Sequence, residues 1–305
     1  MRKRGLLPRI PIALFFTCLT TAHCAGSAPS SAEPGVIGLL GAVTITASAS
    51  ANDPGTPGFA FNYTIGTRPI WLDADVNAVY AENIAYGDDP RHIFDLFMPD
   101  TAGPTPVVIY IHGGGFRGLD KNRPYAFEFT KKDINTLLRN NIAFISIDYR
   151  LLEDSNESQG VRKPLYDSRY ALQFIRYYAS SMNIDPTRVA LWGSSAGAGT
   201  SLWLALNDDM AIPDHPDSIR RMSTRVLGVS GSIPQATYDF TRWETDVLVD
   251  YDWKMEDEFA KDPGLEPRLL DFYAIDSYAD YGTDYVTDYR REVDMLAMMS
   301  PDDPE

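Results

Sequence analysis

The chain has 305 residues, 44% of them hydrophobic, which is enough to bury a sizeable core within one domain. Its formal net charge is −15 at pH 7 and no basic patch interrupts it, which argues against nucleic acid or anionic membranes as partners. Both of its cysteines, Cys18 and Cys24, lie near the N-terminus, so no disulfide framework and no cysteine-bound metal are expected. The histidines do not cluster and the acidic residues are scattered, so the sequence predicts no metal and no cofactor.

Residues 1–25 have the layout of a secretory signal peptide. Basic residues come first, residues 10–22 are mostly apolar, and small residues follow from Ala25 onward. The apolar run is shorter than the about 20 residues of a membrane-spanning helix, so stable membrane insertion is not expected, and an uncleaved anchor is the alternative. The leader therefore predicts a secreted or periplasmic protein.

Residues 26–58 are rich in Ala, Gly, Ser, Thr and Pro and nearly uncharged, which predicts a flexible low-complexity spacer. Within it, the run 36–45 is compatible with a short strand. From residue 59 to residue 305, short apolar runs alternate with longer amphipathic stretches, which is typical of a mostly parallel α/β sheet with helices on both faces. We expect strands at 92–98, 106–111, 142–147, 189–192 and 225–229.

Apolar side chains at helical spacing predict two crossover helices that pack on the sheet. Their buried faces are Phe127, Ile134 and Leu137 in the first, and Leu165, Leu172, Ile175 and Ala179 in the second. Asp185 and Pro186 are expected to end the second helix, and a third helix is expected over 198–206. Residues 232–299 are irregular, acidic and rich in tyrosine, which indicates a cap or an insertion over the sheet.

Two short motifs carry the chemistry. His112-Gly113-Gly114-Gly115-Phe116 follows one buried strand, and Gly193-Ser194-Ser195-Ala196-Gly197 follows another. A Gly-x-Ser-x-Gly turn between a strand and a helix exposes its serine above the carboxyl edge of the sheet, which makes Ser195 a candidate nucleophile. A glycine-rich loop offers backbone N–H groups that, with the N–H of Ala196, form an oxyanion hole.

In these motifs and their spacing, the chain resembles the α/β-hydrolase superfamily, specifically carboxylesterases of the hormone-sensitive-lipase and feruloyl-esterase-like type. The resemblance runs from about residue 83 to residue 301. It includes Asp95, residues 118–121, Asp148-Tyr149-Arg150, Asp167, residues 184–188 and residues 223–225.

The resemblance implies that Ser195 is the nucleophile and that Gly114, Gly115 and Ala196 donate to the oxyanion. Gly113 then shapes the turn, Gly193 and Gly197 support the serine motif, and His112 orders the oxyanion loop and is not the base. The remaining histidines fit the base poorly. His92 falls in a strand pattern and is expected to face solvent, and His215 lies in a turn predicted to be exposed at the far end of the sheet.

No histidine follows His215, and the candidate acids Asp239, Asp246 and Asp276 have no support from their context. The resembling families carry the acid and the histidine on later strands. Residues 300–305 look like the approach to the first of these strands, with an ordinary acidic tail as the alternative. The sequence thus predicts a truncated esterase that lacks its last two strands, through either an incomplete record or an early stop.

Two functions remain open. The first is a secreted serine carboxylic ester hydrolase that forms an acyl-enzyme on Ser195 and acts on short acyl, acetyl or feruloyl esters, either small molecules or polysaccharide-linked. The second is an inactive hydrolase remnant or ligand-binding protein that uses the old cleft or the tyrosine-rich segment. Tyrosines there more often pack than bind ligands. The oligomeric state is not indicated.

Overall fold

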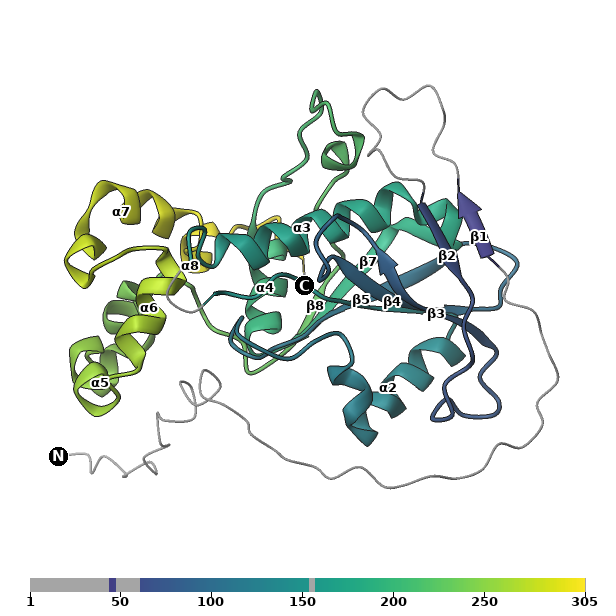
Figure 1. Cartoon of the computed structure of the whole chain (residues 1–305), viewed down its shortest axis with the longest axis horizontal. Helices are drawn as coiled ribbons and strands as arrows, with labels where there is room; N and C mark the ends of the chain where they lie inside the picture. Colours follow the sequence, from purple (N-terminus) through teal and green to yellow (C-terminus); the bar gives the residue numbers. More distant parts are fainter. Residues whose placement is uncertain (1–43, 48–60, 154–156, 305) are drawn as a thin grey trace. The chain divides into compact units, whose positions relative to one another are not determined.

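A mixed sheet of six strands forms the centre of the fold, in the order β3-β4-β6-β5-β7-β8 (Figure 1). The computed structural model describes residues 44–47, 61–153 and 157–304. The strands are β3 (Ala78–Ala85), β4 (Ile93–Pro99), β5 (Thr105–Ile111), β6 (Ala143–Ile147), β7 (Ile184–Ser194) and β8 (Val229–Ser232). Strand β4 is antiparallel to both of its neighbours, and β6, β5, β7 and β8 run parallel.

The register of the parallel strands brings the two sequence motifs together. Ile111 of β5 pairs with Ile147 of β6 on one side and with Gly193 of β7 on the other. The loop that begins at His112 and the turn at Ser195 therefore leave adjacent strands at the same level. This is the carboxyl edge of the sheet, where parallel α/β folds bind their ligands.

Helices cover both faces of the sheet. Helix α2 (Glu128–Arg139) lies on one face, and α3 (Arg162–Tyr177) lies on the other with α4 (Ala196–Leu206) beside it (Figure 1). Three short 3-10 helices accompany them: η2 (Arg123–Ala126), η3 (Ala179–Met182) and η4 (Ser218–Arg221). The predicted apolar face of α3 is buried as expected, whereas α2 buries Ile134 and Leu138 and leaves Leu137 only partly covered.

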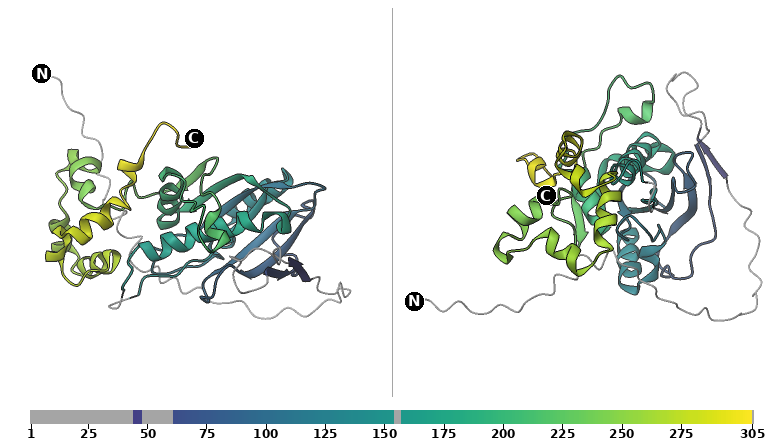
Figure 2. Two further views of the ribbon diagram at one scale, coloured as in Figure 1. Left: turned by 90° about the horizontal axis from the view of Figure 1, so that it is seen from above. Right: turned by 60° about the vertical axis from the view of Figure 1, so that its left-hand side comes forward.

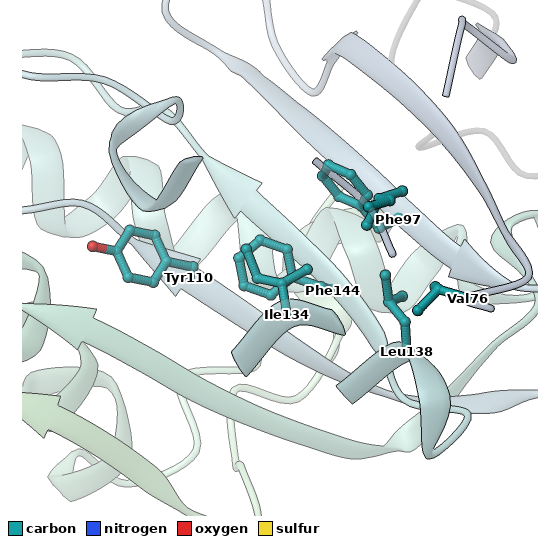
Figure 3. Packing of buried hydrophobic residues seen from close by; sticks show 7 residues of the cluster. Val76, Phe97, Tyr110, Ile134, Leu138 and Phe144 are labelled. Atoms are coloured by element: carbon teal, nitrogen blue, oxygen red, sulfur yellow. The ribbon is translucent and has the colours of Figure 1, made fainter. Parts of the chain in front are cut away.

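One part of the core lies between α2 and the sheet (Figure 3). Its members are Leu72, Val76, Phe97, Tyr110, Ile134, Leu138 and Phe144, all of them buried. Burial of each large apolar side chain stabilises the fold by about 1.5–3 kcal/mol, so this cluster is a main anchor of α2.

The chain after β8 forms a group of short helices. These are the π-helix η5 (Trp243–Val247), η6 (Val249–Tyr251), α5 (Met255–Lys261), α6 (Leu265–Tyr273), η7 (Tyr278–Gly282), α7 (Asp284–Arg291) and α8 (Met295–Met298). Figures 1 and 2 show α5, α6 and α7 together at one end of the sheet, near the start of α3. Among the hydrogen bonds that attach the segment to the rest of the fold are those from Val161 N to Phe272 O and from Trp203 Nε1 to Glu292 O.

The structure confirms the α/β-hydrolase fold class and most of the predicted strands, with two corrections. Asp185 and Pro186 do not end a helix but lie inside β7, because α3 already stops at Tyr177. The strand predicted at 225–229 is β8, Val229–Ser232. Its pairing with β7 begins only at Leu227 and Gly228, where Leu227 N donates to Val189 O and Leu191 N donates to Gly228 O. Among the described residues no strand follows Ser232.

At the N-terminal side, β1 (Thr44–Ala47) pairs antiparallel with β2 (Phe61–Thr64). Strand β1 lies inside the range predicted as a spacer, and the rest of 26–58, like the leader 1–25, lies outside the described residues. The domain boundaries stay predictions. No helix in the described ranges is long and apolar enough to cross a membrane.

Candidate active site

The turn that carries Ser195 joins β7 directly to α4. Ser195 has φ 52° and ψ −122°, a conformation that costs a non-glycine residue on the order of 1–3 kcal/mol. The turn needs glycine on both sides. A Cβ on Gly193 would lie 2.4 Å from the carbonyl carbon and oxygen of Gly197, and a Cβ on Gly197 would lie 2.0 Å from the carbonyl oxygen of Ile111.

The side chain of Ser195 is 5% exposed. Its Oγ has no hydrogen-bond partner among the described residues. The backbone is held from the neighbouring strand, because Ser195 N donates to Ser232 O at 2.8 Å. A buried hydroxyl without a partner is costly in a folded protein and is typical of functional sites.

The glycine-rich loop lies against this turn. A Cβ on Gly113 would be 2.6 Å from Ser194 O and 3.2 Å from Ser195 Cβ. Gly114 and Gly115 have φ values of +98° and +60°, which glycine adopts at no steric cost. Within the described part of the chain, no group accepts a hydrogen bond from the N–H of Gly114, Gly115 or Ala196. The loop and the turn therefore leave backbone donors free beside Ser195.

Two buried tyrosines hold the loop and the turn. Tyr149 Oη donates to His112 O at 2.7 Å and is 3.2 Å from Gly113 O, and Tyr238 Oη donates to Ala196 O at 2.8 Å. Burial raises the pKa of both tyrosines, so both hydroxyls stay protonated donors. The sequence pattern did not predict these contacts. Tyr149 falls only in a stretch that matches the resembling family, and Tyr238 only in the tyrosine-rich segment 232–299.

Comparisons with known proteins agree with this geometry. Residues 94–243 match the family model described as BD-FAE. The chain is 28% identical over 158 residues to the probable isoprenylcysteine alpha-carbonyl methylesterase ICMEL1 of Arabidopsis thaliana, a match that covers 49% of this chain and 30% of that protein. Over about half of its length the chain is therefore similar to carboxylesterases, and its fold is that of an α/β-hydrolase.

Two further relatives give the extent of this likeness. The non-reducing polyketide synthase atr1 of Stereocaulon alpinum is 34% identical over 129 residues, which is 39% of this chain and 5% of the synthase. The solved structure of esterase B from Lactobacillus rhamnosis, inhibited by a tributyrin phosphonate, matches with a TM-score of 0.51 at 20% identity. That match covers 75% of this chain and 63% of the esterase, and it shows the shared fold.

His112 is engaged with the loop and not with Ser195. Its side chain is fully buried and stacks on the Tyr149 ring at 4.2 Å. Its Nδ1 donates to Gly113 O at 2.8 Å, and its Nε2 is 3.3 Å from Asp148 Oδ1. This geometry supports a role in ordering the oxyanion loop.

The prediction that His92 faces solvent is wrong. His92 precedes β4, its side chain is 17% exposed, and its Nε2 lies 3.1 Å from Asp167 Oδ2 of α3. His215 is half-buried, and its Nδ1 accepts from Asp217 N at 3.0 Å within the same turn. Neither imidazole contacts Ser195.

The candidate acids have other partners or none. Asp239 is buried and pairs with Arg290 Nε at 2.8 Å, and Asp246 pairs with Arg242 Nε at 2.8 Å. Asp276 is exposed. None of the three lies against a histidine in the described ranges, so the geometry offers no acid for a triad.

Buried ion pairs support the carboxyl edge behind the glycine-rich loop. Lys121 Nζ lies 2.9 Å from Asp95 Oδ1, and both side chains are almost completely buried. Burial raises the pKa of Asp95 and the ammonium of Lys121 opposes that rise. Lys121 N also donates to Asp148 Oδ1 at 2.7 Å, and the same carboxylate oxygen lies 3.3 Å from His112 Nε2.

The tyrosine-rich segment is mainly a packing unit. Tyr238, Tyr273 and Tyr289 are completely buried, and Tyr273 Oη donates to Tyr238 O at 2.7 Å. Tyr251 and Tyr285 are exposed. No group of three or more potential metal-binding side chains occurs in the part of the chain that the structure describes.

Proposed function

We propose that this α/β-hydrolase is a serine carboxylic ester hydrolase. The observation that carries the proposal is the unpartnered Oγ of Ser195 beside the free N–H groups of Gly114, Gly115 and Ala196. In the proposed reaction, Oγ bonds to the acyl carbon, the carbonyl oxygen becomes an oxyanion, and the N–H groups stabilise it. The C–O bond to the leaving alcohol then breaks, and water later releases the acid from the acyl-enzyme.

The described residues lack a base for this serine. No imidazole in the described ranges reaches Ser195 Oγ, so the hydroxyl stays protonated and is a weak nucleophile. Loss of the base in a serine protease lowers turnover on the order of a millionfold. We therefore propose that the chain reacts at Ser195 with strong electrophiles but turns over esters slowly. The lack of a base among the described residues favours the second candidate function, an inactive hydrolase remnant or ligand-binding protein.

The likeness to the BD-FAE family supports acetyl, short acyl or feruloyl esters as substrates, either free or attached to polysaccharide. The leader at residues 1–25 supports secretion or a periplasmic location, where such polymers would be met. The substrate class and the location outside the cytoplasm are therefore both part of what we propose.

The test compares labelling with turnover. Purified full-length chain would be treated with a fluorophosphonate and, separately, with p-nitrophenyl acetate. We expect labelling that Ser195→Ala abolishes and that Ser230→Ala, a change at an exposed serine of β8, leaves intact. Slow hydrolysis is expected. Efficient hydrolysis that depends on Ser195 would show that some residue of this chain supplies the base, and a chain that is not labelled would contradict the nucleophile.

A further inference from the structure

A cleft of 1040 Å³ is lined mainly by the loop that precedes β4 and by residues of α3. Asp167 lines it, accepts hydrogen bonds from Arg150, and lies 3.1 Å from His92 Nε2. Arg150 follows β6, and β6 is separated from β7 by β5 alone. The segment with Arg150 is therefore two strands away from β7, the strand that leads to Ser195.

The cleft contains a guanidinium that has no carboxylate partner. Arg169 stacks over the Tyr166 ring at 4.5 Å, and its Nη1 is 4.0 Å from Met210 Sδ. Among the described residues no carboxylate lies within 4.0 Å of it, whereas Arg150 makes a bidentate pair with Asp167. Burial lowers the pKa of Arg169, so the group is poorly solvated although it remains charged.

A second guanidinium adds to this charge. Arg220 also lines the cleft, and its nearest carboxylate, that of Asp217, is 3.8 Å away. Its guanidinium lies 5.5 Å from the centre of the Tyr170 ring. In a chain with a net charge of −15, two under-compensated arginines in one cleft indicate an anionic group on the ligand.

The remaining walls restrict the ligand further. Asp88, Asp89 and Gln159 also line the cleft and offer acceptor oxygens. Carboxylates there repel a doubly charged group such as phosphate, and they accept hydrogen bonds from neutral hydroxyls. The tyrosine rings of α3 offer apolar faces of the kind on which the C–H face of a sugar packs.

We propose that this cleft binds a uronic acid unit of a carbohydrate, with its carboxylate on Arg169 and Arg220. The sugar hydroxyls face Asp88, Asp89 and Gln159. The proposal goes beyond ester hydrolysis, because binding here requires no reaction at Ser195.

The test is titration calorimetry of the full-length chain with D-glucuronate, D-glucose and inorganic phosphate. Glucuronate is expected to bind at least tenfold more tightly than either of the others. Arg169→Gln should weaken glucuronate at least tenfold, and Arg169→Lys should weaken it less. Arg291→Gln removes the same charge from an exposed side chain of α7 that pairs with Asp288, and it should leave the affinity unchanged.

Two results would overturn the proposal. Phosphate that binds as tightly as glucuronate would make the cleft a general anion site, and an unchanged glucuronate affinity in Arg169→Gln would remove the main contact. If Arg169→Gln fails to fold, Arg220→Gln decides, since its side chain is 41% exposed and its loss should weaken glucuronate at least threefold. Ser195→Ala should bind glucuronate normally, so failure of the esterase proposal would leave this one standing.

Discussion

The buried hydroxyl of Tyr238 donates a 2.8 Å hydrogen bond to the carbonyl oxygen of Ala196, the residue that follows the candidate nucleophile. The same hydroxyl lies where a side chain on Gly199 would be, since a Cβ there would be 2.3 Å from it. Tyr238 belongs to the segment after β8, and its N–H is bonded to Val293 O. The tyrosine-rich segment therefore holds the first turn of α4 in place.

Tyr238→Phe tests this contact. The variant loses one buried hydrogen bond and leaves Ala196 O with Thr200 Oγ1 as its side-chain donor, so we expect a loss of about 1 kcal/mol in the free energy of unfolding. Because Ala196 N is a proposed oxyanion donor, the rate of fluorophosphonate labelling should fall about tenfold. Tyr285→Phe, at an exposed tyrosine of α7, is the control and should change neither value. Unchanged labelling in Tyr238→Phe would show that the contact is structural only.

The glycine-rich loop gives a second prediction. Gly114→Ala places a Cβ 2.2 Å from Gly118 O at a backbone φ of +98°, so the loop must move. Removal of one oxyanion donor lowers turnover about 10²–10³-fold in serine hydrolases, and we expect a loss of that order in labelling rate. Gly118→Ala is the matched control in the same loop, because a Cβ there meets nothing within 4 Å. Equal rates in the two variants would contradict the oxyanion role of this loop.

Much of the sheet was predictable from the sequence because its strands are buried on both faces and read as apolar runs. Ala143–Ile147 is buried at every position, and the run could only be a core strand of this length. The strand β8 was misplaced because its residues, Val-Ser-Gly-Ser, are mostly exposed and polar, so the apolar run before it does not mark its position.

The backbone of the site could be predicted from the sequence, but the side-chain contacts that hold it in place could not. Glycine spacing alone indicated the close approach of β7, α4 and the loop after β5, because only glycine allows it. The burial of His92 depends on Asp167, a residue far along the chain, and strand alternation therefore suggested the wrong environment. The role of Tyr238 depends on how the final segment folds back, which local sequence does not encode.

The buried pair of Lys121 and Asp95 gives a stability prediction. Lys121→Met removes the cation and leaves a carboxylate that is 0% exposed, whose remaining donors within the described residues are Asn83 N and Tyr125 Oη. Breaking a buried pair in this way typically costs about 3–5 kcal/mol, which urea unfolding would measure. Lys131→Met, which removes the surface partner of Glu128, should cost no more than about 1 kcal/mol. A similar small loss in both variants would show that Asp95 is solvated or protonated in the folded chain.

The last prediction concerns acid. Burial raises the pKa of Asp167, but the hydrogen bonds from His92 and Arg150 outweigh it and hold that pKa below the usual value of 3.8. A carboxyl whose folded pKa lies below its unfolded pKa stabilises the fold above about 3.8, and this contribution is lost as the pH falls through the folded pKa. Asp167→Asn should therefore be clearly less stable than the parent chain at pH 6, and the difference should shrink toward pH 3.

Urea unfolding of both proteins at pH 6, 5, 4 and 3 would measure this difference. Glu157 and Asp209 also have lowered pKa values, although burial opposes the hydrogen bonds that lower them, so both proteins should lose stability in acid. Those losses are common to the two proteins and cancel in the comparison. Asp276→Asn, at an exposed carboxylate, is the control and should match the parent at every pH. A constant difference between Asp167→Asn and the parent would mean that the carboxylate acts through its shape and not through its charge.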